Sequence, residues 1–160
     1  MNQTPKTTRF RRSSNSLQGL WRSLYDCAML KMQAICVDSS DPLTLANFWR
    51  EVLGWRITWE TENEVVLEPP EGSPQDGVAA DVIFLKVPEF KQVKNRLHFD
   101  LRPDVQENEV ARLEALGAQR VSVGQGDGVD WVVMSDPEGN EFDVLRAYSP
   151  EEISGTLTAE

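Results

Sequence analysis

The residues best suited to chemistry are one histidine and a few carboxylates in short strand-like segments. His98 is the only histidine of the chain, and Asp100 follows it in the same apolar run. Asp143 stands between Phe142 and Val144, where strand propensity disfavours an acidic side chain. Because alternate strand residues face opposite sides, Phe142 and Val144 are predicted to face the core. Asp143 then faces either solvent or a polar cavity.

An imidazole can act as a general base, hold a metal ion or bind a polar ligand. A single histidine in a strand is more often a hydrogen-bonded residue of a core or pocket than a metal ligand, so both roles stay open for His98. The sequence has no phosphate-loop, nucleophile-elbow or dinucleotide-binding motif. Residues 124–128 are rich in glycine, but no helix is predicted after them, which argues against a phosphate site.

The segment 136–140, Asp-Pro-Glu-Gly-Asn, is predicted to form the turn of a hairpin. Proline presets its own backbone angle, and glycine and asparagine accept the positive φ of a tight reversal. The flanking segments 131–134 and 142–145 are short and apolar, which is typical of paired strands.

The order of elements is predicted to occur twice. In the first half, Asp41 and Pro42 begin a helix and Gly54 ends it. In the second half, Pro103 and Asp104 open a helix that Gly117 closes. The strands are expected at 33–38, 55–59, 64–68 and 80–87, and then at 96–101, 121–123, 131–134 and 141–146. This repeat predicts an α+β fold of two tandem βαβββ modules, 32–88 and 96–147, whose helix-free faces form a central trough.

Composition limits the classes of function. The chain has 160 residues, 40% of them hydrophobic, and a net charge of −10. Such an acidic protein repels phosphate backbones, so no nucleic-acid partner is expected. No run of about 18 apolar residues is present, and no membrane span is predicted. Cys27 and Cys36 form neither a disulfide framework nor a zinc motif, so a cytoplasmic location is expected.

The two ends of the chain are predicted to lie outside the domain. Residues 1–30 are basic and rich in serine, a composition that a secretory signal, a twin-arginine signal or a transit peptide could explain. Arg22 and Asp26 interrupt the apolar centre that either signal requires. We therefore favour a mobile extension, and we expect residues 148–160 to be a frayed polar tail.

The helix ending in Leu53 and Gly54, the segment 136–143 and the duplicated order of elements together resemble the vicinal oxygen chelate superfamily. This superfamily includes glyoxalase I, extradiol dioxygenases, methylmalonyl-CoA epimerase and the fosfomycin and bleomycin resistance proteins. Within it, residues 32–147 look most like the glyoxalase-like domain group. Metal-dependent members carry four ligands on the trough face. By this resemblance the ligand positions fall on Ala34, Phe84, His98 and Asp143.

The resemblance thus implies an incomplete metal site, because Ala34 and Phe84 cannot coordinate a metal ion. We expect no cofactor, and any divalent metal would rest on His98 and Asp143. A hydrogen bond between these two would raise the pKa of the imidazole. The residues predicted to contact a ligand are Asp38, Phe84, Asp100, Trp131 and Glu141.

Three functions follow as alternatives. The preferred one is a binder of a small organic molecule, in the manner of bleomycin resistance proteins, and the acidic body favours a cationic ligand. The second is a metal-dependent lyase, isomerase or dioxygenase that uses His98 and Asp143. The third is an interaction module whose trough is filled by side chains. Metal content separates the first two. The resemblance also implies a homodimer.

Overall fold

The first module follows the predicted order. The computed structural model describes residues 30–155, and the predicted extension falls almost entirely outside this range. The elements of the first module are β1 (Ala34–Ser39), α2 (Pro42–Leu53), β2 (Arg56–Glu60), β3 (Glu64–Glu68) and β4 (Asp81–Lys86). Each predicted element of this half is present, with ends shifted by at most one residue.

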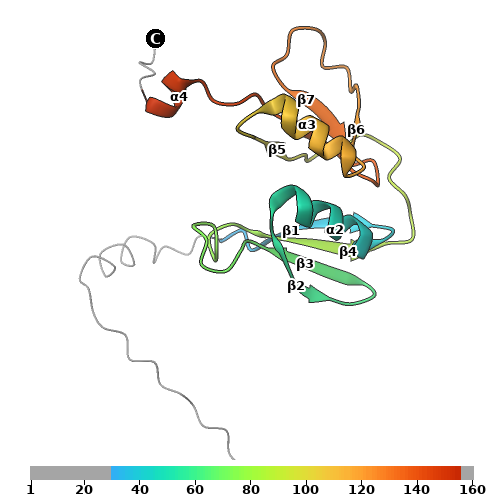
Figure 1. Ribbon diagram of the computed structural model, residues 1–160. Coiled ribbons are helices and arrows are strands. Elements are labelled where there is room, and N and C mark those ends of the chain that lie inside the picture. Colours follow the sequence, from blue (N-terminus) through green and yellow to red (C-terminus); the bar gives the residue numbers. More distant parts are fainter. Residues whose placement is uncertain (1–29, 156–160) are drawn as a thin grey trace, which may run out of the picture. The chain divides into compact units, whose positions relative to one another are not determined.

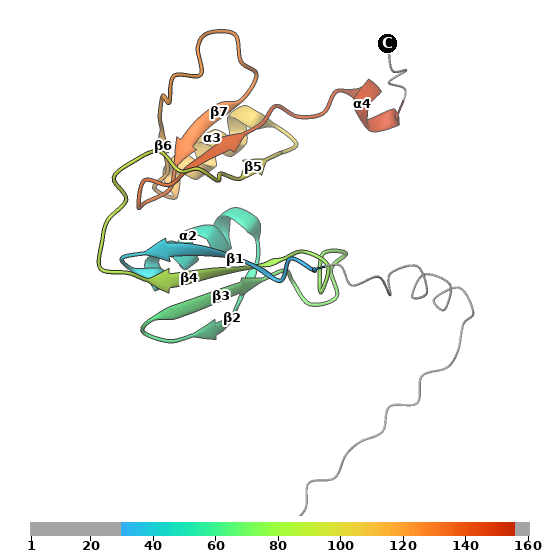
Figure 2. The same cartoon turned by 180° about the vertical axis from the view of Figure 1, so that it is seen from behind.

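The second module repeats this arrangement with shorter strands. Its elements are β5 (Asp100–Leu101), α3 (Gln106–Ala115), β6 (Gln119–Arg120), β7 (Val132–Ser135) and β8 (Glu141–Val144). The sheets have the orders β1-β4-β3-β2 and β5-β8-β7-β6, with β1 parallel to β4 and β5 parallel to β8. This confirms the predicted α+β fold of two βαβββ modules. Each module's helix lies along one face of its sheet (Figure 1), and Figure 2 shows the opposite faces.

Three boundaries of the second module differ from the prediction. The strand expected over 96–101 is regular only in β5, so His98 lies just before it. Residues 121–123 are not a strand, although Val121 N still donates a 3.0 Å hydrogen bond to Val133 O. Helix α3 begins at Gln106 rather than at Pro103, after Val105, whose side chain cannot cap the helix.

Helix α2 carries strong signals at both ends. The Asp41 carboxylate accepts a 3.2 Å hydrogen bond from Thr44 N, and Pro42 occupies the first turn. Gly54 adopts φ 65°, a left-handed conformation that glycine accepts without strain, and its N–H donates to Arg50 O. The helix therefore begins and ends where the sequence predicts.

One hydrophobic core includes residues of both modules. Alternate residues of β3, β4 and β8 point to the helices, as the period of a strand requires. In α2 the aromatic residues are central: the Trp49 ring lies 5.1 Å from Phe142 and 5.3 Å from Phe99. The core members are Leu45, Ala46, Phe48, Trp49, Val65, Leu67, Val82, Phe84, Val110, Leu113, Ala118, Met134, Phe142 and Val144.

The predicted hairpin joins β7 to β8. Asp136 N donates to Asn140 O and Gly139 N to Asp136 O, both at 2.9 Å. The Asp136 carboxylate also accepts hydrogen bonds from Glu138 N and Asn140 N. Gly139 has φ 86°, the conformation for which glycine was expected.

The tail is more ordered than predicted over its described part. Helix α4 (Pro150–Ser154) starts with a capping box made by Ser149 and Glu152. Hydrogen bonds from Arg146 lower the pKa of Glu152 to about 2. No helix among the described residues is long and apolar enough to cross a membrane.

Candidate functional site

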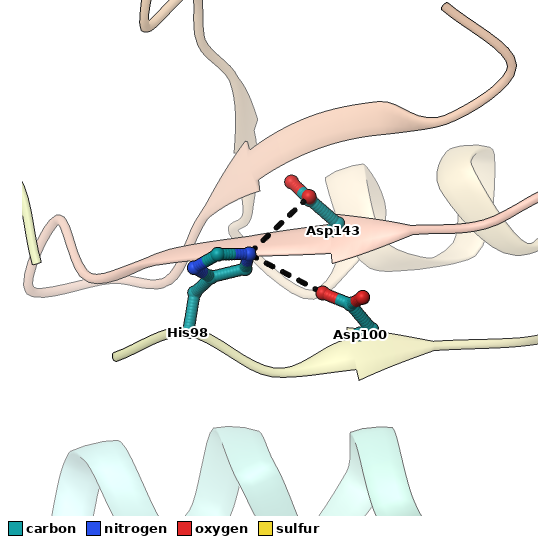
Figure 3. A group of neighbouring side chains, drawn as sticks. All are labelled: His98, Asp100 and Asp143. Atoms are coloured by element: carbon teal, nitrogen blue, oxygen red, sulfur yellow. Dashed lines mark ion pairs between the residues drawn. The ribbon is translucent and has the colours of Figure 1, made fainter. Parts of the chain in front are cut away.

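The strongest chemical cluster consists of His98, Asp100 and Asp143 (Figure 3). Asp100 and Asp143 are direct partners in the parallel pairing of β5 with β8, so their side chains share a face. His98 precedes Asp100 by two residues and reaches the same face. The opposite face of β8 presents Phe142 and Val144 to the core. The alternation predicted for this strand is confirmed.

The imidazole lies between the two carboxylates. His98 Nε2 is 3.4 Å from Asp100 Oδ1 and 3.6 Å from Asp143 Oδ2. The second distance is too long for a hydrogen bond, so the predicted His98–Asp143 hydrogen bond is not formed.

Asp143 is the most enclosed member of this cluster. Its side chain is 15% exposed, against 41% for His98 and 55% for Asp100. Burial raises the pKa of Asp143, and the neighbouring Asp100 charge raises it further, while His98 and Lys94 oppose the shift. A cation placed between these side chains would remove the repulsion between the carboxylates.

Asp100 supplies a third donor beside the two predicted from the sequence, His98 and Asp143. One ligand atom each of His98, Asp100 and Asp143 lies within 4.8 Å of the other two. One imidazole and two carboxylates on one side suit a divalent cation such as Mn²⁺ or Fe²⁺. The exposure of Asp100 and His98 leaves room for water or a ligand on the open side. The donor set therefore fits a metal ion, although a complete site would need further donors.

The predicted placement of Phe84 in the site is wrong. Phe84 is fully buried and points to the helix-covered face of its sheet. The register pairs it with Val37, whereas Ala34 pairs with Asp81. Ala34 and Phe84 thus lie on opposite faces, and they cannot belong to one ligand set. Phe84 is a core residue that stabilises the fold.

A cavity of about 380 Å³, here called the linker cavity, adjoins the His98 cluster. Its walls come from β1, from residues 87–99 between the modules, and from the 136–141 hairpin. Its apolar lining residues are Ile35, Val37, Trp49, Val87, Phe90, Leu97 and Phe99. Because aromatic and aliphatic surface is combined with charged groups, the cavity has the character of a small-molecule site.

The charged lining of the linker cavity is mainly acidic. It includes five carboxylates but only Lys91 and Arg96 as cations, apart from His98. The carboxylates are those of Asp38, Glu89, Asp136, Glu138 and Glu141. The field inside the cavity therefore favours a positively charged ligand.

Three of the predicted site residues line this cavity: Asp38, His98 and Glu141. Glu141, however, is occupied by protein donors. Lys91 Nζ lies 2.8 Å from Oε1 and Asn95 N lies 2.9 Å from Oε2, and these contacts lower the pKa of Glu141 against the effect of its burial. Its role is to hold the segment between the modules. Asp38 is exposed on β1 and free to meet a ligand.

Trp131 is half-buried just before β7 and lines neither of the two cavities described here. The second cavity, of about 620 Å³, lies along the end of α2, the connection from β5 to α3 and α3 itself. None of the predicted site residues lines it. The linker cavity is therefore the better candidate.

The contacts of the hairpin with the first module were not predicted from the sequence. Asp136 Oδ2 accepts a 3.1 Å hydrogen bond from Trp49 Nε1, and both residues are buried. Glu138 accepts from Ser39, Ser40 and Asp41. An acidic residue in a turn is usually exposed, so nothing in the local sequence indicated these partners.

Comparison with known proteins identifies one family model and several solved structures that match this chain. The family model described as "Glyoxalase-like domain" matches residues 34–145. No curated protein is similar enough to count as a match. Similar solved structures include a glyoxalase/bleomycin resistance protein/dioxygenase family enzyme from Burkholderia phytofirmans PsJN. It is 16% identical with a TM-score of 0.56, and the match covers 74% of this chain and 100% of that one.

Two further structures share the fold. A hypothetical protein from S. aureus is 18% identical with a TM-score of 0.55, covering 78% of this chain and 99% of that one. A variant of the fosfomycin resistance protein FosX from Listeria monocytogenes, complexed with Mn(II) and dihydroxypropylphosphonic acid, is 12% identical. Its TM-score is 0.56, and the match covers 78% of this chain and 94% of that one. At such identities the likeness concerns the fold.

Proposed function

This chain belongs to the glyoxalase-like domain family of the vicinal oxygen chelate superfamily, and we propose that it binds a small organic cation in the linker cavity. The observation that carries the proposal is the lining of that cavity. Apolar walls formed by Trp49, Phe90 and Leu97 are combined with an excess of carboxylates. Such a site suits a molecule with an apolar or aromatic body and one ammonium group.

The carboxylates differ in their freedom to meet a ligand. Glu141 is paired with Lys91, and Asp136 is enclosed by donors of Trp49 and Asn140. Asp38 and Glu89 are exposed at the cavity and have no hydrogen bond or ion pair among the described residues. These two are therefore proposed to attract the cationic group, while the apolar walls contact the rest of the ligand.

We expect tyramine to bind more tightly than its uncharged analogue 4-ethylphenol and its anionic analogue 4-hydroxyphenylacetate. The three probes share a phenol ring and differ in charge, so calorimetry on the full chain isolates the electrostatic contribution. Asp38→Asn and Glu89→Gln should each weaken tyramine binding about 2- to 5-fold, the range for an exposed charge pair. Glu60→Gln, on exposed β2, is the matched control. Equal affinity for all three probes would contradict a cation site.

A metal-dependent enzyme is the second candidate, and Asp100 is the observation that favours it. With His98 and Asp143 it offers three ligand atoms where the sequence alone offered two. A bound divalent ion would polarise an oxygen of a substrate or lower the pKa of a bound water. His98, Asp100 and Asp143 would hold that ion.

For this candidate we expect stoichiometric binding of Mn²⁺, Ni²⁺, Zn²⁺ or Fe²⁺ to the untagged full chain, measured by calorimetry and elemental analysis. Asp100→Asn should weaken it about 10-fold or more, because one anionic donor is lost. His98→Ala and Asp143→Asn should do the same, whereas Asp104→Asn, exposed beyond β5, should leave it unchanged. Absence of binding to the parent chain would exclude the metalloenzyme and leave the cation binder.

A further inference from the structure

Helix α2 receives a charged side chain of the second module at its amino end. The Glu138 carboxylate lies at the start of the helix, where Ser40 N donates to Oε2 at 3.1 Å and Asp41 N to Oε1 at 2.9 Å. The hydroxyls of Ser39 and Ser40 also donate to Oε1, both at 2.9 Å. A negative charge is favourable here, because the helix dipole and unpaired N–H groups make this end positive.

The carboxyl end of α2 is contacted by the opposite charge. The Arg112 guanidinium, from α3, donates to Glu51 O at 3.1 Å and to Val52 O at 3.4 Å. These carbonyls belong to the last turn of α2, which has no helical partner for them. Glu109 orients Arg112 by a charge-paired hydrogen bond at 2.9 Å. The second module thus holds α2 at both ends, each time with the charge that complements the dipole.

The cap of the helix itself does not depend on Glu138. Asp41 already accepts hydrogen bonds from Thr44 N and Thr44 Oγ1, which is the ordinary arrangement at a helix start. Glu138 stands outside this local cap and lies 97 residues away in sequence. Its four hydrogen bonds therefore connect two modules rather than complete a single helix.

We propose that Glu138 is a positioning residue: it fixes the first module against the second and thereby sets the width of the linker cavity. Glu138 lines this cavity together with β1, Trp49 of α2, residues 87–99 and the rest of the hairpin. Within the domain, residues 87–99 connect the modules covalently but form no regular element. Without Glu138 the amino end of α2, and β1 before it, lose four hydrogen bonds to the hairpin, and the remaining restraints, the Trp49–Asp136 hydrogen bond and the shared core, allow a wider range of positions.

A measurement of the distance between the modules tests the positioning role of Glu138, and it requires no ligand. Spin labels are placed at Glu60→Cys on β2 and Glu107→Cys on α3, both exposed, in the full chain with Cys27→Ser and Cys36→Ser. Pulsed electron resonance should give one narrow distance distribution. Glu138→Ala is expected to broaden it about twofold, because modules with a weakened interface move relative to each other. Glu62→Ala, a highly exposed glutamate, should leave it unchanged.

Two additional results keep the test decisive. If Glu138→Ala does not fold by circular dichroism, Glu138→Gln replaces it, since it keeps one acceptor oxygen and loses the charge. An unchanged distribution in the folded variant would overturn the proposal. We also expect Glu138→Ala to weaken tyramine binding, because Glu138 lines the linker cavity, and this second expectation rests on the proposed function. If Glu138→Ala broadens the distance distribution but the parent chain does not bind tyramine, the proposed cation binding is wrong and the positioning role of Glu138 stands.

Discussion

Phe142→Ala is expected to lower the free energy of unfolding by about 3–5 kcal/mol, as for other large aromatic side chains removed from a core. Phe142 is completely buried, and its ring lies 5.1 Å from Trp49 and 6.4 Å from Phe48. The substitution would leave a cavity between β8 and α2, which belong to different modules. The total free energy of unfolding of a domain is about 5–15 kcal/mol, so this variant should be only marginally stable.

Urea denaturation followed by circular dichroism measures this effect. Phe90→Ala is the matched control, because Phe90 is 75% exposed and its loss should change the stability by less than about 0.5 kcal/mol. Phe142→Leu retains most of the volume and should cost less than the alanine change. A similar stability of Phe142→Ala and Phe90→Ala would contradict the packing of the second module against α2.

Asp136→Ala is expected to cost about 2–4 kcal/mol, because it leaves several buried donors without a partner. Asp136 is 3% exposed, and its carboxylate accepts hydrogen bonds from Trp49 Nε1, from Glu138 N and from the backbone and side chain of Asn140. The most informative of these contacts is the one with Trp49, since it joins the hairpin to α2.

A double-mutant cycle isolates that contact. Trp49→Phe removes the indole N–H, and Asp136→Asn removes the charge. The difference between the stability loss of the double variant and the sum of the two single losses is the coupling energy of this contact. We expect a coupling energy of about 1–3 kcal/mol, the range for a hydrogen bond to a charged group in a shared network. Trp55→Phe with Asp136→Asn serves as the control pair. A coupling near zero for Trp49 would show that the hydrogen bond does not hold the modules together.

The same carboxylate predicts a dependence on pH. Burial raises the pKa of Asp136, although its hydrogen bonds oppose the shift. The folded state therefore binds the proton more readily than the unfolded state does. The proton-linked part of the contribution of Asp136 to stability is fully present below its unfolded pKa and is lost as pH rises through its folded pKa, whereas its hydrogen bonds with Trp49, Glu138 and Asn140 contribute separately. In Asp136→Asn this part of the pH dependence should disappear from denaturation curves recorded across that range.

Signals within a short stretch of chain predicted the fold well. Asp41 and Gly54 marked the ends of α2, and the segment 136–140 marked the hairpin, because caps and turns depend on neighbouring residues. The boundaries of β5 and β6 were predicted less accurately. These strands have two residues each, too few for a periodic pattern.

The site was harder to predict, for two physical reasons. In β4 the run Val82 to Leu85 is apolar on both faces, so alternation could not show that Phe84 faces the core. The contacts of Glu138 and Asp136 with α2 join residues almost a hundred positions apart, and no local pattern specifies them. Asp100 was assigned to a ligand but not to the metal, because its alignment with Asp143 depends on the strand register.

The positions of β1 and β5 have a further consequence, for solubility. Each is the outer strand of its sheet, so one side of its backbone is not paired with another described strand. Such an edge can recruit a strand from another molecule, and charged side chains are a common protection against it. Asp38 on β1 and Asp100 on β5 stand at these edges. The charges that attract a ligand would then also keep molecules apart, and neutral variants of the site should be checked for self-association before a loss of binding is assigned to the ligand.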